Sequence, residues 1–387
     1  MLEFDPFSEA YFDDPFPIYR RLRDEAPDFY LEELDCFFLS RFEDVWRAVS
    51  NPRFSHRRGT NTQDLLAGVM PKRALSCMVP PAHTALRRAL APCFKPAATR
   101  PLEPWMRKLV GRFLDEVDDE FDVVGDLALR LSARVTFRLI GLPEEDADEM
   151  GELVGTTFER ASGVRGPTEV AFEAQRRLHE YLTEKIDERG HARGGSDLLD
   201  RLLSFEHEGE KLPREELIAN LYLLVIGGTE TLPKVFAGAV HQLWRHPDQR
   251  ASVAATPALA GDAFWEALRY DMPTLMLGSV AEEDAEICGT TQVRKGQKLM
   301  HLWVSANRDE REFPDPDRFD IHRRATRILT FNHGRHYCLG AHIAQLEGRV
   351  LLEELLARAP GYEVREDRAE RIRSELFRGF SSLPIRV

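Results

Sequence analysis

The sequence predicts a mainly α protein with small β-sheets (an α+β fold), built as a single domain over residues 1–387. Two observations predict this class. Segments with apolar residues at helical spacing follow one another along the 387-residue chain, whereas alternating, strand-like stretches are short and lie near residues 29–39 and 272–300. The length would permit two or three domains, but no glycine–serine or proline-rich linker divides the chain. We therefore expect one large domain.

Composition and charge narrow the class further. The chain is 43% hydrophobic and 30% charged, as an ordinary folded soluble protein is, and its net charge of −13 argues against nucleic acid as a partner. The N-terminus has neither a positive region nor an apolar run, and the longest apolar stretch is too short to span a bilayer. We expect a cytoplasmic protein without a membrane anchor. The cysteines lack the paired spacing of a disulfide framework or zinc site: Cys36, Cys77, Cys93, Cys288 and Cys338.

The N-terminal quarter predicts short elements. Helices are expected over residues 14–27 and 41–51, with a hairpin between them. Residues 54–81 show little periodicity and several glycines and prolines, which is typical of a functional loop, although plain disorder fits equally well. The next helix begins after Pro80-Pro81 and places His83 and Arg87 on one face. Two such donors could hold a carboxylate, or form a solvated surface patch.

Amphipathic helices are expected next, at about 101–117, 127–140, 144–160, 168–189 and 197–207. The 144–160 and 168–189 pair, with its glycine-containing connector, suggests a mobile lid. Residues 213–246 then predict one long apolar helix that carries Gly227, Gly228 and Pro233, all of which weaken a helix interior. Such local conflicts are typical of functional sites. Thr231 lies four residues after Gly227, so its hydroxyl can reach the Gly227 carbonyl.

The last third carries a cysteine loop. Residues 272–300 predict short strands, preceded by a helix in which Glu266 and Arg269 can pair. Cys338 has glycines four residues before it and two after, and a long helix follows from Ala341. The N-terminus of that helix should favour the thiolate, and a buried thiolate held by peptide N–H groups can bind haem iron. For a lone cysteine, a buried structural role is the alternative.

The run from Phe331 to Gly340, Phe-Asn-His-Gly-Arg-His-Tyr-Cys-Leu-Gly, resembles the haem-binding loop of the cytochromes P450, in particular the soluble bacterial branch. The resemblance implies the P450 fold, with haem b (iron protoporphyrin IX) between the long helix and this loop. It implies Cys338 as the iron ligand, His336 as the partner of a haem propionate and Phe331 as the ring beside the sulfur, with Gly334 and Gly340 shaping the loop. Asn332 stands where glycine is usual.

Three further segments resemble the same family. Gly227-Gly228-Thr229-Glu230-Thr231 is similar to its oxygen-binding signature, which implies room for dioxygen at both glycines and a catalytic acid–alcohol pair in Glu230 and Thr231. Leu232 and Pro233 depart from that pattern. The 80–88 segment implies propionate contacts from His83 and Arg87, with Val79 in place of the usual aspartate. Ser279 stands where an arginine usually binds a propionate.

The resemblance also implies a structural network and a substrate pocket. The network would be a buried charged cluster of Glu266, Arg269 and Arg318. The pocket candidates are apolar and suggest a terpenoid, steroid or polyketide-like substrate: Leu65, Leu66, Met70, Ile226, Leu275, Met276 and Phe377. Arg57 and Arg58 could instead anchor a carboxylate.

The implied activity is a monooxygenase that inserts one oxygen atom from O2 into an apolar small molecule, with electrons from a separate iron–sulfur ferredoxin and its reductase. A basic patch for this acidic donor could be formed by Arg88, Lys95, Lys108, Arg335 and Arg349, although scattered solvated charge is equally consistent. We expect a monomer. The alternatives are a P450-fold peroxygenase or nitric oxide reductase, and a non-catalytic haem-binding sensor; the Glu230-Thr231 pair favours oxygen activation.

Overall fold

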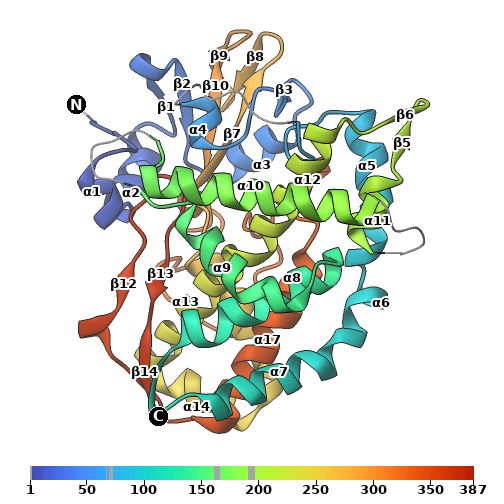
Figure 1. Ribbon diagram of the computed structural model, residues 1–387. Helices are drawn as coiled ribbons and strands as arrows, with labels where there is room; N and C mark the ends of the chain where they lie inside the picture. Colours follow the sequence, from blue (N-terminus) through green and yellow to red (C-terminus); the bar gives the residue numbers. More distant parts are fainter. Residues whose placement is uncertain (1, 67, 69–72, 161–165, 191–196) are drawn as a thin grey trace.

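The computed structural model describes residues 2–66, 68, 73–160, 166–190 and 197–387. Helices make up the larger part of the described chain, and the strands form small sheets, so the predicted fold class is confirmed. Figure 1 shows the strands of the main sheet at the top of the view, the helices below them, and the C-terminal strands along the lower left side.

The main sheet joins the N-terminal hairpin to the 272–300 region. Its order is β1 (Asp28–Leu31), β2 (Cys36–Leu39), β10 (Lys298–Leu302), β7 (Met276–Ala281) and β3 (Phe54–Ser55). β2 and β10 are parallel and the other neighbours are antiparallel. The hairpin predicted near residues 29–39 is therefore confirmed. A separate hairpin follows β7, formed by β8 (Ala285–Ile287) and β9 (Thr291–Val293).

Six α-helices begin in the N-terminal quarter of the chain, among the residues that the structure describes. They are α1 (Glu9–Asp13), α2 (Phe16–Glu25), α3 (Phe42–Ser50), α4 (Thr62–Leu65), α5 (Ala82–Leu90) and α6 (Pro96–Thr99). The helices predicted at 14–27 and 41–51 are α2 and α3. The sequence did not predict α4, which is a single turn capped by the Asn61 side chain, whose Oδ1 accepts from the Asp64 N–H at 2.9 Å.

The central helices match the periodic segments. They are α7 (Glu103–Glu116), α8 (Arg130–Ile140), α9 (Ala147–Thr156), α10 (Glu169–Gly190) and α11 (Leu198–Leu203). A π-helical turn over Val123–Leu129 leads into α8, after strand β4 (Glu120–Asp122). The helix expected over 197–207 ends early, in a hairpin of β5 (Glu206–His207) and β6 (Glu210–Lys211). Glu208 and Gly209 both have positive φ (56° and 83°), which a right-handed helix cannot accommodate.

The long helix predicted over 213–246 is interrupted at one residue. α12 (Arg214–Thr229) and α13 (Thr231–Arg245) meet at Glu230. Pro233 has no N–H for the Thr229 carbonyl, and the Ser132 hydroxyl of α8 donates to that carbonyl instead, at 3.2 Å. By length and composition the joined helix could cross a membrane, but 67% of its most apolar window is buried inside the protein, as in a core helix.

Helices of the C-terminal third pack against α13. This third of the chain contains α14 (Pro247–Ala255), α15 (Ala260–Tyr270), α16 (Trp303–Ala306) and α17 (Ala341–Arg358). The strands that end the chain are β11 (Glu363–Val364), β12 (Glu370–Arg371), β13 (Phe380–Ser382) and β14 (Pro384–Arg386). β14 lies between β11 and β4, so the C-terminus pairs with the segment before α8.

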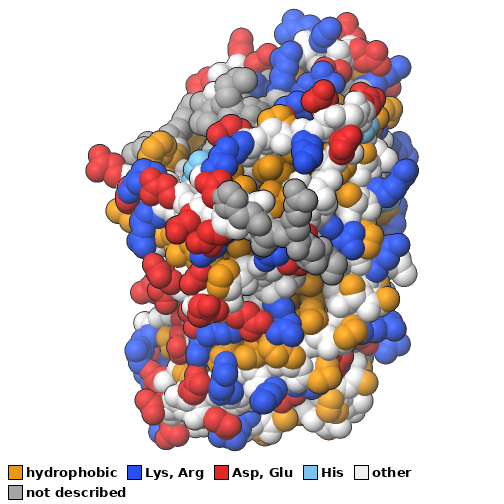
Figure 2. Space-filling view, turned by 45° about the vertical axis from the view of Figure 1, so that its right-hand side comes forward, with side chains coloured by type: hydrophobic (Ala, Val, Ile, Leu, Met, Phe, Trp, Pro, Cys, Tyr) orange, Lys and Arg blue, Asp and Glu red, His pale blue; other side chains and the backbone are white. Residues whose placement is uncertain are grey.

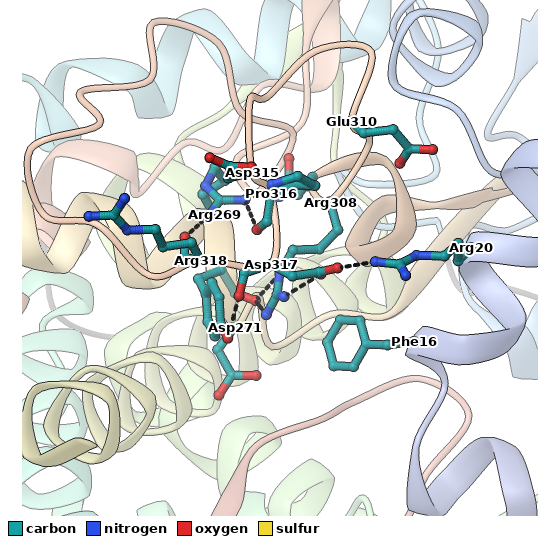
Figure 3. Close-up of polar contacts among 12 residues, drawn as sticks. Phe16, Arg20, Arg269, Asp271, Arg308, Glu310, Asp315, Pro316, Asp317 and Arg318 are labelled. Carbon is teal, nitrogen blue, oxygen red and sulfur yellow. Dashed lines mark hydrogen bonds and ion pairs between the residues drawn. The ribbon is translucent and has the colours of Figure 1, made fainter. Parts of the chain in front are cut away.

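The buried charged network has a different third member from the one expected. Arg269 binds Glu266 through two hydrogen bonds of 2.9 and 2.7 Å, and both side chains are buried. Arg318 contributes only its backbone carbonyl, 3.4 Å from Arg269, and its guanidinium points away (Figure 3). The expected role of its side chain is therefore wrong. Arg323 takes that place, with Nε 3.1 Å from Glu266 Oε1.

We predict that Arg323→Met lowers the free energy of unfolding by about 3 kcal/mol, because it leaves a buried carboxylate partly uncompensated. The matched variant Arg318→Met should change it by no more than about 0.5 kcal/mol, since that exposed guanidinium binds none of the network. Urea unfolding of both variants measures the difference. Equal destabilisation by the two substitutions would contradict the assignment.

Candidate functional site

The loop before α17 turns through two left-handed residues. Asn332 has φ +60° and Gly334 has φ +70°. Asparagine is one of the few residues besides glycine that tolerate this region, and the Asn332 Oδ1 accepts from the His333 N–H at 2.6 Å. The exchange of glycine for asparagine thus preserves the turn. The loop closes where the Cys338 N–H donates to the Phe331 carbonyl at 2.7 Å.

Two opposing influences act on the Cys338 thiol. The residue is solvent-exposed, yet the surrounding protein removes enough water from the thiol to raise its pKa. The Gly340 N–H and the Arg87 guanidinium oppose this rise. The N–H of Gly340, at the start of the helix, thus favours the thiolate as expected, but burial outweighs it in the metal-free chain. A metal cation at the sulfur would reverse the balance, since a coordinating thiol is deprotonated.

Histidines gather next to this cysteine. The ring centroid of His336 lies 4.3 Å from that of His83 on α5 and 4.2 Å from that of His56. Arg87 donates to the Tyr337 carbonyl, and its charge acts on the Cys338 thiol. The structure therefore brings the predicted His83, Arg87, His336 and Cys338 together. Their spacing in the sequence predicted His83 and Arg87 as one face, but gave no sign of His56.

A further histidine lies beside Ser279, the position where we noted a missing arginine. The His301 Nε2, on β10, lies 3.2 Å from the Ser279 hydroxyl on β7. Buried ring nitrogens without a hydrogen-bond partner among the described residues include His56 Nδ1, His83 Nε2 and His301 Nδ1; others, such as His241 Nδ1, belong to a different part of the protein. Burial lowers the pKa of His56 and His83 to about 4 and that of His301 to about 3. Unpaired buried ring nitrogens near a cationic Arg87 fit an anionic ligand such as a carboxylate.

The two glycines of α12 have different surroundings. Gly227 is exposed although α12 crosses the protein, and a Cβ there would meet no atom within 4 Å. The Thr231 hydroxyl lies 3.4 Å from the Gly227 carbonyl, as its spacing predicted. A Cβ at Gly228 would instead lie 2.3 Å from Thr136 Oγ1, so this glycine allows close packing of α12 on α8. Open space therefore lies at Gly227, and the expectation of room at Gly228 is not met.

Glu230 forms a buried ion pair that the sequence analysis missed. The Lys234 ammonium contacts the Glu230 carboxylate and donates to the Glu230 carbonyl at 2.8 Å. Burial raises the pKa of Glu230 despite this partner. The spacing of four residues on a helix is the signal that could have revealed the pair.

The described candidate pocket residues come from four separate segments. Leu65 and Leu66 are buried at the end of α4, Leu275 and Met276 at the start of β7, and Phe377 near the C-terminus, while Ile226 on α12 is partly buried. The Leu275 N–H donates to the Leu376 carbonyl at 2.8 Å, which joins two of these segments. Met70 lies outside the described residues. Arg57 lines a pocket of about 330 Å³ together with His56, Arg335 and His336.

These features fit a site for a thiolate-ligated haem. The sulfur would hold the iron, the unpaired ring nitrogens and Arg87 suit two carboxylates, and Gly227 leaves open space. The comparisons agree. The family model "Cytochrome P450" matches residues 259–382. The chain is 36% identical to "Putative cytochrome P450 123" of Mycobacterium bovis, over 100% of this chain and 97% of that protein.

Two other relatives cover the chain equally well. The "Vitamin D(3) 25-hydroxylase" of Pseudonocardia autotrophica is 33% identical, over 98% of this chain and 96% of that protein. The crystal structure of "Epothilone D-bound Cytochrome P450epoK" superposes with a TM-score of 0.88 at 28% identity, covering 100% of this chain and 99% of the other. The chain therefore belongs to the cytochrome P450 family. It is a monooxygenase of bacterial type, and its family binds haem b.

We predict that His301→Gln flattens the pH dependence of stability in the haem-free protein. A histidine whose pKa falls on folding contributes stability above its unfolded pKa of about 6.5, and that stability is lost as the pH falls. With a folded pKa of about 3 for His301, the wild type should lose about 2 kcal/mol between pH 7 and pH 5 through this residue, which H301Q should not lose. Urea unfolding at both pH values tests this, and an equal loss in the two proteins would contradict it.

Proposed function

We propose that this protein inserts one oxygen atom from O2 into a lipophilic small molecule, by hydroxylation or epoxidation, with electrons from a separate ferredoxin and ferredoxin reductase. The observation that carries the proposal is Cys338, whose thiol lies beside the Gly340 N–H and the Arg87 guanidinium, both of which favour the thiolate. A thiolate is the form of cysteine that binds a metal. We further propose that residues 1–387 form one P450 domain, active as a cytoplasmic monomer.

Different residues of this chain would have different roles in cofactor binding. When bound, haem supplies the oxygen activation and electron transfer, while the protein positions the reactants and moves protons. Cys338 would hold the iron, and His83, Arg87 and His336 would hold the carboxylates of the cofactor, with His56 and His301 next to them.

Residues at the C-terminal end of α12 and the start of α13 would leave space for a ligand and supply protons. Gly227 leaves a gap in the helix surface, and the Thr231 hydroxyl at that gap can order a water molecule or pass a proton. Glu230, one residue earlier, is the acid that can replenish it. Phe331 and Gly334 fix the loop that presents Cys338.

A lipophilic substrate is supported by the lining of the pocket and by the relatives. The described candidate residues are all apolar, and the Phe377 ring stands edge-on to that of Phe158 on the segment after α9, with centroids 4.7 Å apart. One relative is described as acting on vitamin D(3), and one similar structure contains epothilone D. Both molecules are large and apolar. We therefore propose a terpenoid, steroid or polyketide-like substrate.

A ferredoxin donor is supported by basic residues near the cysteine loop. Arg88, Lys95, Lys108 and Arg335 have no ion pair among the described residues, although most arginines of this acidic chain are paired. We call these four the donor patch. Arg349 does not belong to it, because Glu103 and Glu353 bind its guanidinium at 2.6 and 3.2 Å. Figure 2 shows a face on which acidic side chains gather toward the left of the view.

We predict that Cys338→Ser abolishes the red-shifted Soret band of the reduced carbon monoxide complex, because only a thiolate ligand produces that shift. The absorption spectrum of the reduced, carbon monoxide-treated protein measures this. The control Cys93→Ser, on the short turn after α5, should keep the band. If C338S retained the wild-type band, the proposed function would be wrong.

We predict product formation from a steroid test substrate when the protein is combined with a [2Fe–2S] ferredoxin, its reductase and NADPH. Arg88→Glu should lower the rate about tenfold at low salt, because it places a negative charge in the donor patch. Arg386→Glu, on β14, is the matched control and should leave the rate unchanged. Turnover with peroxide alone, and none with ferredoxin, would identify a peroxygenase instead.

A further inference from the structure

Glu230 and Lys234 form a pair that the proposed chemistry does not explain. Their side chains are 5% and 6% exposed, and the two residues lie four apart at the point where α12 gives way to α13. Lys234 donates to both the carboxylate and the carbonyl of Glu230. A buried lysine is rare unless it is paired, and here one ammonium group binds two oxygens of the same residue.

The pair holds the carboxylate away from the open space. The Thr231 hydroxyl bonds toward Gly227, at the α12 side of the interruption, whereas the Glu230 carboxylate bonds toward Lys234, on the α13 side. In the described structure no hydrogen bond joins Glu230 to Thr231. The acid is therefore adjacent to the alcohol in sequence but is not connected to it in this conformation.

The Lys234 side chain is held by the C-terminal segment. Gly379 has φ +140°, and a Cβ there would lie 2.8 Å from the Cβ of Lys234, so only glycine lets this segment close over the lysine stem. The ammonium lies 5.6 Å from the centre of the Phe377 ring. One lysine thus contacts the candidate proton donor and a candidate wall of the substrate pocket.

We propose that Lys234 is a positioning residue that keeps Glu230 ionised and turned along α13, so that Glu230 supplies a proton to the oxygen site only when the pair separates. In that step the carboxylate takes a proton from solvent water and passes it to the Thr231 hydroxyl or to a water bound there. The contact with Phe377 gives the substrate pocket a route to the pair. This inference rests on the proposed function.

The charges around Glu230 are consistent with this role for Lys234. Burial favours the protonated form of Glu230, and the Lys234 ammonium is the charge that opposes it. Without the ammonium, a carboxyl group in this environment should bind a proton at neutral pH. The charge of Glu230 is then a direct readout of what Lys234 does, and it does not depend on turnover.

Infrared difference spectroscopy of the haem-loaded protein at neutral pH tests this readout. Lys234→Met should produce a new carboxylic acid C=O band, which disappears in the double variant E230Q/K234M. Wild type and Lys234→Arg should lack the band. Lys185→Met is the matched control. Lys185 pairs with Glu188 on α10, and because that carboxylate is exposed, loss of the lysine should produce no buried acid. A band already present in wild type, or none in K234M, would overturn the proposal.

A second measurement tests the effect on proton supply. With ferredoxin, reductase and NADPH but no substrate, K234M should release hydrogen peroxide about ten times faster than wild type, because the acid is always protonated. E230Q/K234M should not show this increase. Equal release by K234M and wild type would overturn the inference. The carbon monoxide spectrum of each variant reports on the thiolate ligand, so a failure of the proposed function can be told apart from a failure of this inference. If K234M does not fold, Lys234→Gln takes its place.

Discussion

The structure depends on the opposing influences that the protein exerts on one sulfur atom. In the chain itself burial favours the neutral thiol of Cys338, against the opposing influence of the Gly340 N–H and Arg87. A cation bound at the sulfur would favour the anion, since a coordinating thiol is deprotonated. His56, His83 and His301 also carry buried ring nitrogens without a hydrogen-bond partner. A ligand that bound these groups in the folded chain alone would stabilise the fold.

Most of the fold could be predicted from periodicity and chain breakers. The long helices have regular apolar spacing, and Pro233 and the glycines marked the interruption at Glu230. Elements that depend on pairing between distant segments could not be predicted. β14 is three residues long and is stabilised by β4, which lies more than 250 positions earlier, so no local signal announces it. The β5–β6 hairpin was missed because Glu208 adopts positive φ without being glycine.

In the candidate site, too, residues in local motifs could be predicted, whereas residues brought in by strand pairing could not. Cys338, His83, Arg87 and Thr231 lie in short motifs, and the structure places them as their spacing indicated. His56 and His301 come from segments without a motif, and they reach the site only through the pairing of β3, β7 and β10. The replacement of Arg318 by Arg323 illustrates a further limit. Several arginines follow one another in that segment, and only the path of the backbone decides which one meets Glu266.

The hydrogen bond from Ser132 to the Thr229 carbonyl links two parts of the molecule that local sequence keeps apart. Pro233 has no N–H to donate to the Thr229 carbonyl, and the Ser132 hydroxyl donates to it instead. This hydrogen bond joins α8 to the interruption between α12 and α13. α8 also packs on α9, the first helix of the pair expected to form a lid, and Gly151 of α9 approaches the Ala133 methyl group closely. A shift of α9 would therefore be transmitted through α8 to the backbone beside Glu230, where α12 and α13 meet.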